Sequence, residues 1–205
     1  NILNSMTLST SNTTVDNSVL NNVTNSGTNG TLNINSSTME INNQLLNNSA
    51  IATIKDSNVK TSTYNSITNS GTLTIENSNI ESSNANTITN TSTMNILSGN
   101  IISTNGLGIK NTGTLTMGVK DKSVESDTPC IEGTTYGLDT LNSTFNFYDG
   151  KIIGPEDHAI NGSATLTADS YSEYKVNKDG KQIDTLAQLD PVQNDRTKVS
   201  YKNLQ

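Results

Sequence analysis

Residues 69–75 read Asn-Ser-Gly-Thr-Leu-Thr-Ile, and close copies of this stretch follow at regular intervals. Residues 90–96 read Asn-Thr-Ser-Thr-Met-Asn-Ile, and residues 111–117 read Asn-Thr-Gly-Thr-Leu-Thr-Met. The copies are about 21 residues apart, a period that is typical of repeat architectures and not of ordinary globular domains. More degenerate copies end at Ile54, Leu8, Ile34, Phe147 and Ala168. The repeat therefore covers most of the chain.

Polar and apolar residues alternate within each copy. This period of two places Leu73 and Ile75 on one face of a strand and Thr72 and Thr74 on the other. The equivalent apolar pairs are Leu32/Ile34, Ala52/Ile54, Met94/Ile96, Leu115/Met117, Phe145/Phe147 and Leu166/Ala168. We predict that these pairs point into a common core.

Two further apolar columns accompany each copy. One lies about five residues after the pair and contains Met39, Val59, Ile80, Ile101 and Ile152, with Val124 displaced by two. The other lies about eight residues before the last residue of the pair and contains Leu46, Ile67, Ile88, Ile109 and Ile160, with Leu138 displaced by one. Because bend-prone residues such as Gly99 separate the columns, each repeat is expected to form three short strands.

These features predict an all-β fold, a right-handed parallel β-helix with three short strands per coil of about 21 residues and roughly eight coils. A β-sandwich also has many short strands, but it has no reason to keep equivalent residues in register at this period. Residues 1–170 are expected to form the repeats. Residues 171–205, where the pattern fades, are expected to form an irregular C-terminal cap or the start of a following segment.

Asparagines recur at two positions of the coil. One column contains Asn48, Asn69, Asn90 and Asn111, and the other contains Asn58, Asn79 and Asn100. Asparagine tolerates the left-handed backbone of a tight corner, and stacked amides can pass hydrogen bonds from coil to coil. We therefore expect both columns to form structural ladders at corners.

Composition narrows the range of partners. The chain carries a net charge of −7 with only 12 Lys and Arg residues, which disfavours nucleic acid and anionic membranes. No apolar run is long enough for direct membrane insertion. The lone Cys130 cannot form an internal disulfide, and its simplest role is that of a small buried side chain. Since residue 1 falls within the repeat pattern, we expect a monomeric segment of a longer chain.

The repeat of Asn-x-Gly-Thr-Leu-Thr-Ile, with an apolar residue five positions on, resembles the pectate-lyase-like parallel β-helix of bacterial surface adhesins and autotransporter passenger domains. The resemblance covers about residues 1–168. It implies an extracellular rod at the bacterial cell surface, which acts as a stalk or binds a host glycan or an extracellular-matrix protein. The motif residues are those that build the coil, so they do not specify an activity.

Catalytic chemistry has little support in the residues. Polysaccharide lyases and glycoside hydrolases need converging carboxylates, and one dense acidic group, Asp121, Glu125, Asp127 and Glu132, occurs in an insertion. We interpret these four residues as a candidate ligand-binding loop, and we expect no catalytic residue, metal site or cofactor. A polysaccharide-cleaving enzyme remains the alternative. His158 fits a wall column that elsewhere holds Gln44, Asn65, Asn86, Leu107 and Tyr136.

Outward threonines suggest a second alternative. The positions beside the inward pairs hold Thr31, Thr72, Thr93, Thr114, Thr144 and Thr165, and a neighbouring column holds Asn33, Thr53, Thr74, Asn95, Thr116, Asn146 and Thr167. A flat face of this composition resembles those of ice-binding solenoids, although threonine is also a common residue on exposed strands. The sequence therefore favours a non-catalytic adhesin rod, with an enzyme and an ice-binding protein as alternatives.

Overall fold

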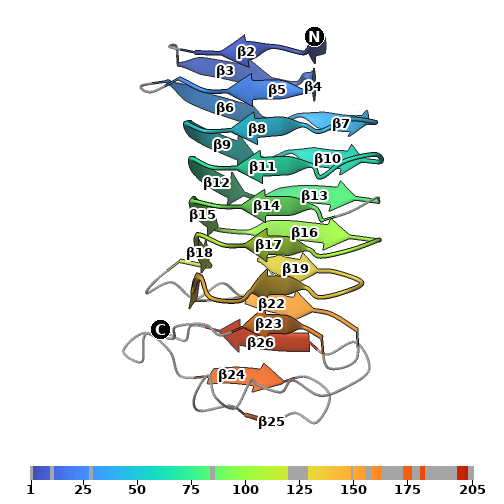
Figure 1. Ribbon diagram of the computed structural model, residues 1–205, viewed down its shortest axis with the longest axis vertical. Helices are drawn as coiled ribbons and strands as arrows, with labels where there is room; N and C mark the ends of the chain where they lie inside the picture. The colour runs from blue at the N-terminus through green and yellow to red at the C-terminus, as the bar shows by residue number, and fades with distance from the viewer. Residues whose placement is uncertain are drawn as a thin grey trace.

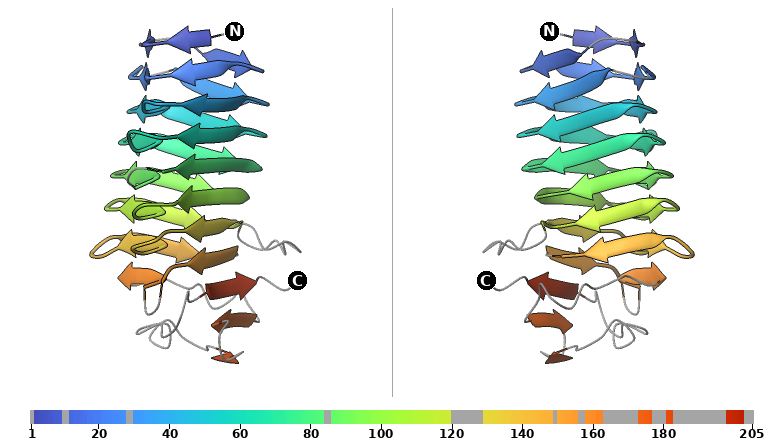
Figure 2. Two further views of the ribbon diagram at one scale, coloured as in Figure 1. Left: turned by 90° about the vertical axis from the view of Figure 1, so that its right-hand side faces the viewer. Right: turned by 90° about the vertical axis from the view of Figure 1, so that its left-hand side faces the viewer.

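The computed structural model describes residues 2–9, 12–27, 30–83, 86–119, 129–148, 150–155 and 158–162, and strands at 173–176, 181–182 and 198–202. Every regular element in these ranges is a β-strand. The strands wind into coils that stack along one long axis, beginning at the N-terminal end (Figures 1 and 2). Equivalent strands of successive coils pair in parallel and form three long sheets.

Two of the sheets consist of parallel pairs throughout. The seven-stranded sheet contains β3 (Thr13–Asp16), β6 (Thr31–Asn35), β9 (Ile51–Lys55), β12 (Thr72–Glu76), β15 (Thr93–Ile96), β18 (Thr114–Met117) and β21 (Thr144–Phe147). The eight-stranded sheet contains β2 (Thr7–Leu8), β5 (Val23–Asn25), β8 (Leu46–Asn48), β11 (Ile67–Asn69), β14 (Ile88–Asn90), β17 (Ile109–Asn111), β20 (Leu138–Thr140) and β23 (Ile160–Gly162).

The third sheet ends differently. The nine-stranded sheet begins with the parallel strands β7 (Thr38–Ile41), β10 (Asn58–Thr61), β13 (Ser78–Ser82), β16 (Gly99–Ser103), β19 (Cys130–Glu132) and β22 (Gly150–Ile153). It continues through β26 (Lys198–Lys202), β24 (Glu173–Val176) and β25 (Lys181–Gln182), which pair antiparallel. At the opposite end, β1 (Ile2–Asn4) and β4 (Val19–Asn21) form a separate parallel pair.

The predicted rungs stack as the period requires. Leu73 pairs with Met94, and Met94 pairs with Leu115, in consecutive strands of the seven-stranded sheet. All three side chains are fully buried in one core that lies between the three sheets and contains residues from each of them. Each coil contributes only a few aliphatic groups, and these groups become dry because the neighbouring coils cover them. The predicted all-β parallel β-helix is confirmed, with about seven turns and three strands per coil.

The structure corrects the register around the insertion. Ile131 pairs with both Ile101 and Ile152, so it fills the core position that the sequence assigned to Val124. Val124 lies outside the described residues. The extra residues therefore enter between β18 and β19, before the strand begins. Leu138 pairs with Ile109 and Ile160 without displacement, because the coil closes its register before the next strand.

The first turn also differs from the prediction. Val15, and not Leu8, pairs with Ile34 in the seven-stranded sheet. Leu8 instead pairs with Asn25 in the eight-stranded sheet. The sequence placed Leu8 in this column by assuming an insertion of about five residues before the coil of Ile34. The structure shows the opposite, because this coil is shorter than 21 residues and equivalent positions such as Ser18 and Ser37 are only 19 residues apart. The difference between about seven and roughly eight turns arises at the ends, where Ala168 lies outside the described residues.

One asparagine column is a continuous internal ladder. Asn48 Nδ2 donates to Asn69 Oδ1, Asn69 Nδ2 to Asn90 Oδ1 and Asn90 Nδ2 to Asn111 Oδ1, each at 2.7 Å. Asn25 adds one more rung at 2.8 Å. These side chains are at most 2% exposed. The amides thus satisfy one another along the axis, which removes the cost of burying them.

The prediction that these asparagines adopt the left-handed backbone conformation of a tight corner is wrong. The four predicted residues are the last residues of their strands, and none of them has a positive φ. Left-handed conformations occur instead at another corner, at Asn17, Ser36, Asp56 and Asn77, with φ between 44° and 50°. The second predicted column lies on the outer surface, where Asn100 Nδ2 donates to Asn79 Oδ1 at 2.6 Å and Asn79 pairs in register with Asn58.

A serine ladder at the left-handed corner was not predicted. The backbone N–H of Ser37 donates to Ser57 Oγ at 3.1 Å, and that of Ser57 donates to Ser78 Oγ at 3.0 Å. Each hydroxyl in turn donates to the carbonyl two residues earlier, as Ser57 does to Lys55 at 2.8 Å. The serines therefore link each corner to the next coil while keeping buried polar groups paired.

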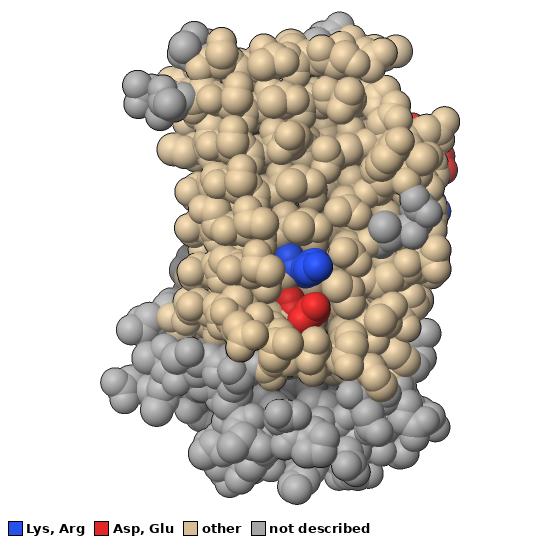
Figure 3. Space-filling model, viewed as in Figure 1, with Lys and Arg blue, Asp and Glu red and all other residues tan. Residues whose placement is uncertain are grey.

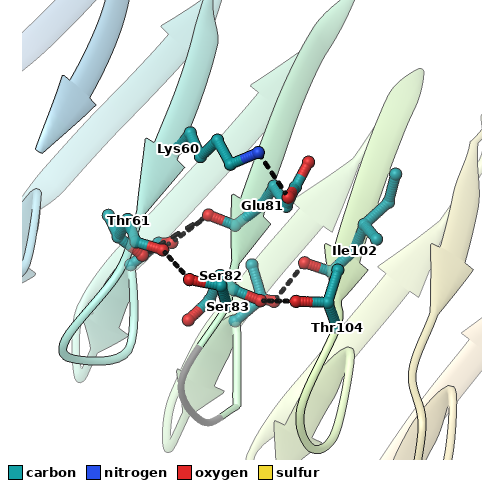
Figure 4. A network of polar contacts seen from close by, with 9 residues as sticks. Lys60, Thr61, Glu81, Ser82, Ser83, Ile102 and Thr104 are labelled. Carbon is teal, nitrogen blue, oxygen red and sulfur yellow. Dashed lines mark hydrogen bonds and ion pairs between the residues drawn. The ribbon is translucent and has the colours of Figure 1, made fainter.

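A third corner carries a network of hydroxyl groups (Figure 4). Ser83 Oγ donates to the Thr61 carbonyl and Thr104 Oγ1 donates to the Ser82 carbonyl, both at 3.4 Å. The side chains of Thr61 and Ser82 are fully buried, and both bond the Tyr64 carbonyl at 3.2 Å. Polar groups thus hold all three corners, and the aliphatic groups fill the space between the sheets.

Candidate functional site

The predicted acidic loop is only partly described. Glu132 is the last residue of β19, where it is partly exposed and pairs in register with Ile102 and Ile153. Asp121, Glu125 and Asp127 lie outside the described residues. Further up the same outward column, Lys60 separates Glu40 from Glu81. Within the described ranges, no group of three or more His, Cys, Asp or Glu residues could hold a metal ion.

The outward face of the seven-stranded sheet is mostly hydroxyl and amide. Thr72, Thr93, Thr114 and Thr144 stack in consecutive strands. In the preceding coil this position holds Ile51, which is 50% exposed and interrupts the threonine column. The neighbouring column contains both threonine and asparagine in no regular order, and Asn146 Nδ2 donates to Thr116 Oγ1 at 3.3 Å. This face offers regular hydrogen-bonding groups but not a uniform composition.

Two ion pairs join adjacent coils on the surface. Lys55 Nζ lies 2.8 Å from Glu76 Oε1, and Lys60 Nζ lies 3.1 Å from Glu81 Oε1 (Figure 4). The hydrogen bond from Lys55 to Glu76, together with the negative charge of that carboxylate, raises the pKa of the Lys55 ammonium above its ordinary value. Both side chains of this pair are more than a third exposed, so solvent screens their attraction.

We predict that Glu76→Gln lowers the pKa of Lys55 and has little effect on stability at neutral pH. A raised pKa in the folded protein means that the pair stabilises it below the ordinary pKa of lysine and that this contribution disappears as the pH rises through the raised value. NMR titration of the Lys55 side chain measures the shift. Glu81→Gln, in the other ion pair, is the matched control, and an equal shift of Lys55 in that variant would contradict the assignment.

The eight-stranded sheet carries two outward columns that are close together. The first lies two residues before the first residue of each strand and includes Gln44, Asn65 and Asn86. The second lies in the strands and includes Asn47, Thr68 and Thr89. Gln44 Nε2 donates to Thr68 Oγ1 at 2.7 Å, and Asn65 Nδ2 donates to Thr89 Oγ1 at 3.0 Å. A residue of the first column thus reaches the second-column residue of the next coil.

Both columns change composition in the C-terminal coils. The first continues with Leu107, Tyr136 and His158, and the second with Lys110, Asp139 and Asn161. We call these six residues the C-terminal patch. Amide and hydroxyl groups of the upstream coils are replaced there by two aromatic rings, a cation and a carboxylate.

Contacts within the patch orient its side chains. The ring centroids of Tyr136 and His158 are 4.6 Å apart, with an interplanar angle of 54°. Asn161 Nδ2 donates to Asp139 Oδ1 at 3.0 Å. Lys110 is exposed, and the other four residues named here are partly exposed. In Figure 3, charged atoms of the described residues form one small group in the middle of an uncharged surface, apart from those at its right-hand edge.

His158 lies in the wall column that the sequence predicted, beside Tyr136. The sequence identified this column but did not show that it adjoins a charged column across the strand. The signal was present, because Gln44, Asn65 and Asn86 give way to aromatic residues in the same column. The chemistry of the patch combines ring faces with hydrogen-bond donors and acceptors of both charges.

Comparisons with known proteins gave no match. No family model, curated protein or solved structure is similar to this chain at the level that indicates a relationship. Among the described residues, no helix has the length and hydropathy that are needed to cross a membrane. The functional interpretation therefore depends on the coil surface and its side chains.

Proposed function

We propose that this chain is a non-catalytic, extracellular β-helix of a bacterial cell-surface adhesin, of the pectate-lyase-like type also found in autotransporter passengers. It acts as a stalk, as a surface that contacts glycans or host protein, or as both. The observation that carries this proposal is the continuous stack of coils (Figure 2), which on the face shown in Figure 3 presents few charged residues. The outward columns of two sheets consist mainly of threonine and asparagine.

The internal ladders support a mechanical role. Strand pairing and the chain of amides from Asn25 to Asn111 both run along the long axis. Bending or separating two coils would break several backbone hydrogen bonds and one hydrogen bond between side-chain amides at once. The side-chain amides would then lose their partners inside an apolar core, which is costly. A rod of this construction resists proteases, because cleavage requires local unfolding.

The surface supports a role in recognition. Outward hydroxyls and amides can donate and accept hydrogen bonds to sugar hydroxyls and to peptide groups. The net charge of −7 opposes binding to nucleic acid or to anionic lipid. In one outward column of the nine-stranded sheet, Glu40, Glu81 and Glu132 are separated by Lys60 and Ile102, an arrangement that gives little support to a pair of catalytic acids.

The test uses the intact chain in two assays. Beads coated with the chain are expected to attach to cultured epithelial cells or to matrix proteins more than beads coated with an unrelated acidic protein. Incubation of the chain with pectin, xylan and hyaluronan is expected to leave polymer length unchanged, as measured by size-exclusion chromatography. Shortening of any polymer would overturn the non-catalytic assignment, and attachment no greater than that of the control beads would overturn the role in adhesion.

A further inference from the structure

We infer that the C-terminal patch binds a neutral oligosaccharide, with Tyr136 and His158 as a stacking platform and Asp139 and Asn161 as the groups that hold ring hydroxyls. This inference rests on the proposed function and assigns its binding activity to one surface. Tyr136 and His158 are positioned by consecutive coils, and Asp139 and Asn161 by the consecutive strands β20 and β23.

The placement of aromatic residues supports a stacking platform at Tyr136 and His158. The chain has no Trp, two Phe residues that are both buried in the core, and six Tyr residues, of which Tyr64 is exposed at a different corner. Tyr136 and His158 instead occupy an outward column that begins with three amides and continues through Leu107, and their rings contact each other. Aromatic rings that remain partly exposed offer an apolar face to a ligand. The C–H face of a pyranose ring has the shape and polarity to cover such a face.

The hydrogen-bonding groups lie beside the platform. Upstream, a first-column residue reaches the second-column residue of the next coil at 2.7 Å and 3.0 Å. By this equivalence we infer that Tyr136 lies next to Asn161, which is bonded to Asp139. The contacts of Asp139 within the described residues both go to Oδ1, from Asn161 Nδ2 at 3.0 Å and the Leu141 N–H at 3.4 Å. Asp139 Oδ2 and the side-chain oxygen Oδ1 of Asn161 are therefore available to accept hydrogen bonds from sugar hydroxyls.

Charge and spacing select the class of sugar. Lys110 and Asp139 are register partners, so the local charges balance, while the whole chain at −7 repels a polyanion. Coils repeat at about 4.8 Å along the axis, which is similar to the length of one residue in an extended polysaccharide. Successive sugar residues can therefore meet successive coils. A neutral, extended chain of pyranose units fits these conditions better than an acidic one.

The only histidine of the chain provides a direct test. Its imidazole proton resonances can be followed by NMR without assignment while cellohexaose, xylohexaose and mannohexaose are added separately. We expect a saturable shift with at least one of these neutral probes and no comparable shift with hexagalacturonic acid. No shift with any neutral probe, or a tighter interaction with the acidic one, would overturn the inference.

Variants separate the patch from the rest of the rod. Tyr136→Ala is expected to weaken binding of the responding probe about tenfold or more, and Tyr136→Leu, which copies Leu107 one coil away, should do the same with less risk to folding. Asn65→Ala, in the same column upstream, should bind as wild type. Unchanged affinity in both Tyr136 variants would overturn the inference. If these variants also keep bead attachment to cells, the proposed adhesin function stands while this assignment of its site falls.

Discussion

Asn90→Asp is expected to lower the free energy of unfolding by about 3 kcal/mol or more at pH 7, because a buried charge would stand where a donor is needed. Asn90 is fully buried, and its Nδ2 donates to Asn111 Oδ1 at 2.7 Å, to the Ser92 carbonyl at 3.1 Å and to the Thr114 carbonyl at 3.2 Å. An aspartate would place a second acceptor against these three oxygens.

The pH dependence of this variant follows from the same contacts. Burial among acceptors favours the protonated form, so the folded pKa of Asp at position 90 is raised above the unfolded value of about 3.9. Protonated aspartic acid can donate one bond, and the penalty is therefore smallest below about pH 4 and grows as the pH rises toward the folded pKa. Urea unfolding followed by circular dichroism, between pH 3 and pH 8, measures the effect.

Asn47→Asp is the matched control for this substitution. It introduces the same chemical change at an exposed position of β8, next to the ladder residue Asn48. Its effect on stability should be small and nearly independent of pH. Equal losses for the two variants would show that the internal ladder does not stabilise the coils, and would contradict the mechanical role that we assign to it.

Phe145→Ala is expected to destabilise the C-terminal coils by about 3–5 kcal/mol, since it leaves a large cavity in the core. Phe145 is fully buried and its ring lies 5.2 Å from that of Phe147. These are the largest side chains of the interior, and they occupy the last described strand of the seven-stranded sheet. Coils contact only their neighbours, so the loss should remain local.

Hydrogen exchange resolved by strand tests this locality. Protection should fall in β18, β20 and β21 and remain high in β9 and β12. Phe145→Leu, which copies the residue at the register partner Leu115, should cost less than about 1.5 kcal/mol because most of the volume is kept. A uniform loss of protection along the whole rod in Phe145→Ala would show that the coils unfold as one unit.

The candidate site was only partly predictable. Spacing placed His158 and Tyr136 in one column, and the structure puts their rings in contact. The contact between this column and the neighbouring one, seen upstream between Gln44 and Thr68, crosses from a corner to a strand of the next coil, and no sequence period expresses it. Of the four acidic residues proposed as a ligand-binding loop, Glu132 alone lies in the described ranges, at the end of β19.

The sequence by itself determined the coil. The alternation of polar and apolar residues along each strand determines which side chains face inward. The period of about 21 residues requires equivalent residues of successive coils to lie next to each other, so Leu73, Met94 and Leu115 had to stack. Tertiary structure decided what a period cannot: that Val15 replaces Leu8, that Ile131 replaces Val124, and that serines hold the left-handed corner. Coil length varies at the corners, and only the packed chain sets where each corner absorbs or loses a residue.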